Sequence, residues 1–144
     1  MRYRVVAVGR VRNAALRAAC DEYRDRLRHY ARVEEREVKH EARVLEAVPE
    51  DSRLVALSRR GEEWSSLQLS EWTARWDQEG RDVTFAIGGS EALPEPVLQR
   101  AEWVWSLSRL TFPHELARVA VYEQLYRAYT IRRGEPYHRR ADDE

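Results

Sequence analysis

Cysteine and long apolar runs are what this sequence lacks most. Cys20 is its one cysteine, so an internal disulfide and a cysteine-based zinc site are both excluded. Because Cys20 lies in an alanine-rich helical stretch, we expect it in the core. No apolar run approaches the roughly 18 residues of a membrane helix, and the first apolar stretch is too short for a signal peptide. These absences predict a protein of the cytoplasm with no membrane anchor.

An excess of charge of one sign is missing as well. The formal net charge is zero, which argues against binding nucleic acid by bulk electrostatics. Lys39 is the only lysine, so nearly every basic residue is arginine. The arginine side chain forms bidentate hydrogen bonds with phosphate and stacks on bases. A GC-rich coding bias accounts for the same composition. Arginine content alone therefore does not decide for an RNA partner.

Standard catalytic and phosphate-binding motifs are also absent. There is no G-x-G-x-x-G, no P-loop, no G-x-S-x-G elbow and no H-E-x-x-H. The histidines are not spaced as metal ligands and no acidic cluster occurs, so we expect no metal site. We expect His29 and His40 to face solvent. His114 stays open between a structural and a functional role, whereas His138, in a polar tail, is a functional candidate.

Strands and helices alternate along the chain. Short apolar or β-branched runs predict strands at residues 3–8, 33–38, 53–57, 83–87 and 103–107. Helical spacing predicts helices at 14–30 after an Asn13 cap, 40–48, 94–102 and 113–133, and one that Ser66 or Ser70 caps and Gly80 ends. The pattern predicts one α/β domain over residues 1–144, with a mostly parallel sheet and helices on both faces. The polar second strand belongs near an edge, and a polar loop containing Gly61 follows the third.

Three strand ends are the candidate ligand site. In open α/β sheets, ligands bind outside the carboxyl ends of the strands. Residues 57–61, 87–91 and 107–113 follow strands and have unusual composition. The paired glycines Gly88 and Gly89 let another group approach the backbone closely, because no Cβ intervenes. A plain tight turn explains the same pair.

The last helix is apolar over more than one face. Its apolar positions include one stripe and a wider arc: Leu116, Val119, Ala120, Val121, Tyr122, Leu125, Tyr126 and Tyr129. A helix of this kind is either deeply buried in its own chain or shared with a partner. We expect a homodimer interface here, with a single intramolecular core helix as the alternative.

Two stretches together resemble one family. They are WSLSRLTFPHELARVAVYEQLYRAYTIRRGEPYHRR from Trp105 and FAIGGSEAL at residues 85–93, supported by VAL at 55–57 and the opening VVAVG. They resemble the RlmH family, the ribosomal RNA large subunit pseudouridine N3-methyltransferases of the SPOUT class. The sequence departs from the family pattern at Ala92, often glycine in the family, and at Ser58, often acidic.

The resemblance implies a fold and a cofactor. It implies a SPOUT-type fold with a C-terminal trefoil knot, whose loops bind S-adenosylmethionine. Carried over by position, the cofactor-binding residues are Leu57, Gly88, Leu107, Ser108, Arg109, Leu110, Thr111 and Phe112. The implied substrate is N3 of a pseudouridine in large-subunit (23S) ribosomal RNA, within the ribosome, and the implied assembly is a homodimer through the last helix.

The polar tail, residues 137–144, carries the candidate catalytic residues. We expect His138 to act as the base that accepts the N3 proton, Arg139 to stabilise the resulting anion or hold phosphate, and Tyr137 to stack on the target base. In a dimer, the tail of one chain could complete the pocket of the other.

Three other functions stay open at this stage. The chain could be a ribosome-binding module without catalysis, a SPOUT methyltransferase with a different RNA target, or an unrelated nucleotide-binding α/β protein. The missing phosphate motifs disfavour the last of these.

Overall fold

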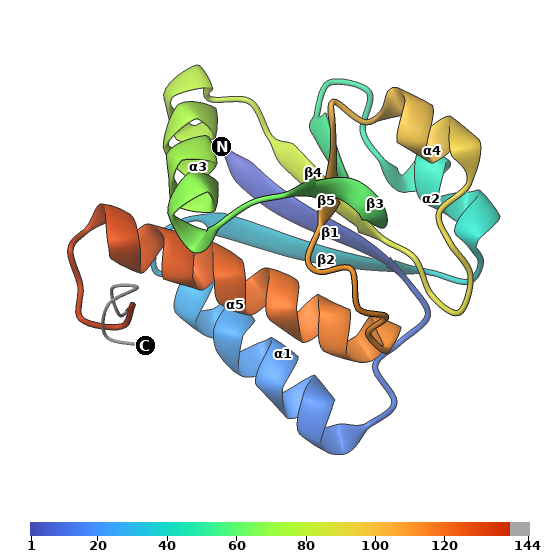
Figure 1. Cartoon of the computed structure of the whole chain (residues 1–144), viewed down its shortest axis with the longest axis horizontal. Helices are drawn as coiled ribbons and strands as arrows, with labels where there is room; N and C mark the ends of the chain where they lie inside the picture. The colour runs from blue at the N-terminus through green and yellow to red at the C-terminus, as the bar shows by residue number, and fades with distance from the viewer. Residues whose placement is uncertain (139–144) are drawn as a thin grey trace.

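The computed structural model describes residues 1–138, which form five strands and five α-helices (Figure 1). The strands are β1 (Arg2–Val8), β2 (Arg32–Val38), β3 (Arg53–Glu63), β4 (Val83–Ile87) and β5 (Trp103–Ser106). The helices are α1 (Ala14–Leu27), α2 (Val44–Ala47), α3 (Ser66–Glu79), α4 (Glu95–Arg100) and α5 (His114–Arg132), with a 3₁₀ turn η1 (Glu41–Arg43) before α2. No described helix is long and apolar enough to cross a bilayer.

The strands form one parallel sheet in the order β2-β1-β4-β3-β5. The central strand β4 is buried at all its residues, which is the pattern of a parallel strand covered on both faces. The polar strand β2 lies at an edge, as its sequence predicted. The predicted parallel α/β architecture is therefore confirmed.

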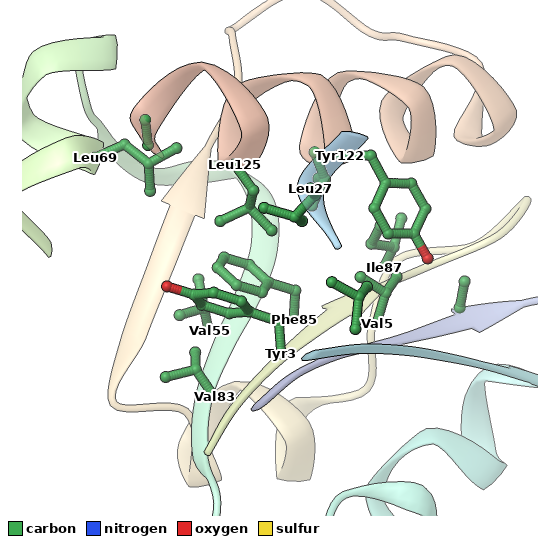
Figure 2. Packing of buried hydrophobic residues seen from close by; sticks show 14 of the residues in the cluster. Tyr3, Val5, Leu27, Val55, Leu69, Val83, Phe85, Ile87, Tyr122 and Leu125 are labelled. Carbon is green, nitrogen blue, oxygen red and sulfur yellow. The ribbon is translucent and has the colours of Figure 1, made fainter. Parts of the chain in front are cut away.

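Helices cover both faces of the sheet, also as predicted. Helices α1, α3 and α5 pack on one face and α2 and α4 on the other (Figure 1). Figure 2 shows the first of these cores, where Tyr3 and Phe85 of the sheet meet Leu125 of α5. Cys20 is fully buried there, as expected, and burial raises the pKa of its thiol to about 11.

Local signals fix most helix ends. The Asn13 side chain accepts a hydrogen bond from the Leu16 amide at 3.0 Å, as expected of an N-cap. Gly80 ends α3 in the left-handed conformation at φ 72°. The predicted caps of α3 were wrong: Ser65 caps this helix in a reciprocal capping box with Gln68. Helix α1 also ends at Leu27, three residues before the predicted end.

The polar loop predicted around Gly61 is wrong, because β3 continues to Glu63. The pairing with β5 is interrupted: Trp105 is the partner of Leu57 and again of Glu62, so the residues between them bulge out of register. A Cβ at Gly61 would lie 2.3 Å from the carbonyl oxygen of Val104. The backbone at Gly61 therefore packs directly against the backbone of β5, with no space for a side chain between them.

A buried arginine fixes the start of α5 against the sheet. Arg118 is 1% exposed, donates a 2.7 Å hydrogen bond to the carbonyl of Gly9 and pairs with Glu37 of β2. Its neighbour Tyr122 donates to Glu35 at 2.7 Å. Burial alone would raise the pKa of Glu35, but hydrogen bonds from Tyr122 and Arg17 lower it below its ordinary value. The helix is thus held at the carboxyl ends of β1 and β2.

This attachment decides which side of α5 faces the protein. Tyr122, Leu125 and Tyr129 are buried in the chain's own core, so most of the wide apolar arc is intramolecular. The stripe with Leu116, which is 40% exposed, and half-buried Ala120 is left partly open to solvent. The surface available to a partner is accordingly narrower than the sequence indicated.

Candidate functional site

A bulge in the middle of β3 and the loops after β4 and β5 meet around one cavity of about 510 Å³. They meet because β3 lies between β4 and β5 in a parallel sheet, where Leu57 is level with the carboxyl ends of those two strands. His114 and Ala117 of α5 contribute to the wall. The remaining lining residues come from the β3 bulge, the end of β4, the two loops and α4: Leu57, Ser58, Arg59, Arg60, Ile87, Gly88, Gly89, Ser90, Glu91, Ala92, Leu93, Leu98, Leu107, Ser108, Leu110, Thr111 and Phe112.

The residues predicted for cofactor binding gather at this cavity, with one exception. Those that line it are Leu57, Gly88, Leu107, Ser108, Leu110, Thr111 and Phe112. The exception is Arg109, whose side chain is 90% exposed and whose Nε lies 3.4 Å from a carboxylate oxygen of Glu63. The structure thus brings the set together, and its role in binding stays a prediction.

Short serine contacts shape the loop after β5. The Ser106 hydroxyl donates to the carbonyl of Ser108 at 3.0 Å, and the Ser108 hydroxyl accepts from the Leu110 amide at 3.0 Å. Such side-chain contacts bend the backbone without a regular turn. They leave the Leu110 side chain 69% exposed and that of Phe112 37% exposed, at the rim of the cavity.

The loop after β4 depends on glycine. A Cβ on Gly88 would lie 2.7 Å from the carbonyl oxygen of Glu91, closer than real Cβ contacts, so any side chain there would force the loop open. Gly88 and its neighbours lie on the cavity wall. The paired glycines predicted that another group approaches the backbone closely. At Gly88 that group is the carbonyl oxygen of Glu91 in the same loop.

Tyr137 and His138, the tail residues that the structure describes, do not line this cavity. They contact α5 at Glu123 and Arg127, about 14 and 20 Å along the helix from His114 on the cavity wall. The hydroxyl of Tyr137 donates to Glu123 at 2.8 Å, and Arg127 Nη1 lies 3.2 Å from Nδ1 of His138. Burial and the neighbouring Glu123 raise the pKa of Tyr137. Arg139 lies outside the described residues.

The family model described as a predicted SPOUT methyltransferase matches residues 1–138. A ribosomal RNA large subunit methyltransferase H of Anaeromyxobacter sp. (strain Fw109-5) is 45% identical, over 96% of this chain and 100% of that relative. The chain belongs to this SPOUT methyltransferase family. A further methyltransferase H, from Burkholderia mallei (strain SAVP1), is 39% identical over 96% of the chain and 99% of that relative. The family resemblance read from the C-terminal signature is confirmed.

The fold of this chain is also found in a solved structure. A probable methylase family protein from Haemophilus influenzae Rd KW20 superposes with a TM-score of 0.64 over 96% of this chain and 70% of that chain. The two share 11% sequence identity, so the likeness concerns the arrangement of the backbone.

Two residues of α5 that line the cavity, His114 and Ala117, were not identified from the sequence. The role of His114 stayed open, and Ala117 was not singled out. Periodicity could have suggested them, because they lie one turn apart at the start of α5 and directly follow the loop after β5. His29 and His40 are exposed, as expected.

Proposed function

We propose that this chain is an S-adenosylmethionine-dependent methyltransferase that modifies N3 of a pseudouridine in large-subunit ribosomal RNA on the assembled ribosome. The observation that carries the proposal is the cavity lined by the β3 bulge and by the loops after β4 and β5, in a chain whose methyltransferase H relatives match it over nearly their whole length. Residues 1–144 act as a single domain.

The composition of the cavity suits this cofactor. Its size lies within the range of about 300–1,000 Å³ usual for small-molecule sites. Apolar side chains such as Leu57, Ile87 and Leu107 offer walls for a flat adenine, and the loops offer backbone polar groups for its edge. S-adenosylmethionine has no phosphate, so the missing phosphate motifs do not count against it. When bound, it supplies a methyl group on a cationic sulfur, an activated electrophile.

The residues of the tail provide the acid–base chemistry. N3 of pseudouridine carries a proton at neutral pH and has to lose it for the nitrogen to attack. His138 accepts this proton, Arg139 stabilises the anion or holds a phosphate, and Tyr137 stacks on the target base. Positioning of the nucleophile by these groups supplies much of the remaining rate.

The enzyme works as a homodimer through α5. Tyr137 and His138 pack on Glu123 and Arg127 of their own helix, about 14–20 Å along α5 from His114 on the cavity wall, so the tail of the partner is the one that completes each site. The exposed apolar stripe at Leu116 and Ala120 supports an interface on this helix.

The C-terminal part of the chain forms a trefoil knot. Two observations support it: Trp105 has pairing partners in both the first and the last part of β3, and Gly61 presses on the backbone of Val104. In Figure 1 the last part of β3 passes across β5 on its way to α3. A segment of β3 that crosses β5 makes the kind of loop through which a knotted chain is threaded.

Substrate recognition depends on the ribosome more than on free RNA. With zero net charge, the chain has little long-range attraction for phosphate. Arg59 and Arg60 on the cavity wall and exposed Arg109 form a local basic group. Arginines there can bind RNA phosphates once the shape of the ribosome has brought them close.

Methyl transfer from labelled S-adenosylmethionine tests the proposal. Ribosomes from a strain without the modification are the substrate, with isolated subunits, protein-free ribosomal RNA and transfer RNA as parallel reactions. We expect label in 23S RNA from ribosomes or subunits, mapped to one pseudouridine, and little label in free RNA. Label in transfer RNA alone would show a different target, and cofactor binding without any transfer would favour the non-catalytic module.

A further inference from the structure

One carboxylate outside the cavity holds part of its wall. Glu41 lies in η1, the turn that follows β2. Its Oε2 atom accepts hydrogen bonds from the backbone amides of Gly89, at 3.1 Å, and Glu91, at 3.3 Å. Both amides belong to the loop after β4 that lines the cavity, whereas Glu41 itself does not line it.

The contact leaves little room for a side chain at residue 89. A Cβ on Gly89 would lie 3.0 Å from the same carboxylate oxygen and 3.0 Å from Cγ1 of Val8. The side chains of Glu41 and Val8 would have to move by a few tenths of an ångström to admit it. Glycine at this position lets the carboxylate reach the loop backbone without that shift, a role that the sequence alone did not distinguish from a tight turn or a ligand approach.

The charge of Glu41 is directed at the loop. Within residues 1–138, no arginine, lysine or histidine nitrogen lies within ion-pair distance of it, and the nearby Arg43 pairs with Glu46 instead. Hydrogen bonds from backbone amides to a carboxylate are charge-assisted and stronger than neutral ones. Because one oxygen atom accepts from both amides, it holds the loop between Gly89 and Glu91 in one conformation. It also gives each of these amides a hydrogen-bond partner.

From these contacts we infer that Glu41 is a positioning residue for the cofactor site. It holds residues 88–91 in the conformation that forms the cavity wall, and it acts on the cofactor only through that backbone. The inference rests on the proposed function for the identity of the ligand. It predicts an effect on S-adenosylmethionine binding and none on recognition of the ribosome.

Two substitutions at residue 41 and one matched control test this role. Glu41→Ala removes both hydrogen bonds, Glu41→Gln keeps one neutral oxygen acceptor and the same shape, and Glu46→Ala removes an exposed carboxylate nearby that pairs with Arg43 and makes no hydrogen bond to the loop within residues 1–138. Amide hydrogen exchange at Gly89 and Glu91 is measured without cofactor. The cofactor Kd is then measured by calorimetry, and the KM values for cofactor and ribosome are compared.

We expect Glu41→Ala to speed exchange at both amides and to weaken cofactor binding about tenfold, which corresponds to about 1.4 kcal/mol, because it removes two charge-assisted hydrogen bonds from the loop. Glu41→Gln should recover part of both effects, Glu46→Ala should match the wild type, and the ribosome KM should not change. Unchanged amide exchange in Glu41→Ala would overturn the inference, and so would faster exchange with wild-type affinity. Failure of the wild type to bind S-adenosylmethionine would instead contradict the proposed function, while the exchange data would still decide whether Glu41 holds the loop.

Discussion

A chain that ends at Glu135 is expected to bind S-adenosylmethionine normally and to transfer methyl groups at least about 100-fold more slowly than the full chain, the usual contribution of a positioned acid–base group. Cofactor binding should survive because the cavity is lined by the β3 bulge, two strand-end loops, part of α4 and the first turn of α5, and the polar contacts of Tyr137 and His138 are with Glu123 and Arg127 further along α5. Calorimetry gives the Kd, and labelled transfer to ribosomes gives kcat. The truncation keeps the hydrogen bond from Tyr30 to Glu135, which ties the end of α5 to α1.

Mixed dimers decide whether the tail acts across the interface. The shortened chain has an intact cavity, and a full-length Gly88→Val chain has an intact tail but a distorted loop after β4. Neither homodimer should be active, whereas dimers that contain one of each should recover activity at one of their two sites. A shortened chain with full turnover would contradict the role of the tail. A narrower variant, His138→Ala with full turnover, would eliminate this histidine as the base.

The second large effect is expected at Gly61. Gly61→Ala would place a methyl group 2.3 Å from the carbonyl oxygen of Val104, and since both partners are backbone, neither can rotate away. We expect a loss of about 3 kcal/mol in the free energy of unfolding, at the upper end of overpacking effects. Denaturant unfolding at equilibrium measures this loss.

Gly80→Ala is the matched control for Gly61→Ala. An added Cβ at Gly80 meets no atom within 4 Å, although its φ of 72° strains any side chain, so this substitution should cost about 1–2 kcal/mol. If Gly61→Ala were no more destabilising than Gly80→Ala, the close crossing of β3 over β5 would not exist in solution.

Elements with local signals were predictable from the sequence. Residues 83–87 are apolar and bounded by an aspartate and two glycines, and the structure places β4 there without change. Asn13 and Gly80 acted as the start and stop signals that their chemistry predicts. The polar pattern of residues 33–38 correctly indicated an edge strand.

The second half of β3 could not be predicted in the same way. Residues 58–63 are polar and charged, so they have neither the alternation nor the apolar run of a strand. They pair because tertiary structure brings Trp105 and Ser106 beside them. The sequence likewise offered Ser66 or Ser70 as the cap of α3, whereas the reciprocal hydrogen bonds with Gln68 in the folded chain select Ser65.

The site was predictable as a set of loops but not in its details. The rule that ligands bind at the carboxyl ends of parallel strands led to residues 57–61, 87–91 and 107–113, which lie around the cavity, although the first of these segments is a bulge within β3 and not a loop. The rule could not show that Arg109 points to Glu63 and away from the cavity, or that Glu41, 48 residues earlier in the chain, contacts Gly89. Both depend on side-chain directions that only the assembled fold defines.

The most direct test of the central claim is the change in backbone amide NMR shifts when S-adenosylmethionine is added to the wild-type protein. We predict that the amides that shift are concentrated at residues 57–61, 87–92 and 107–112, the three segments around the cavity. A saturable change in all three segments would establish them as one binding site. No change in these segments, or changes centred on a second surface hollow at residues 28–34, would contradict this assignment.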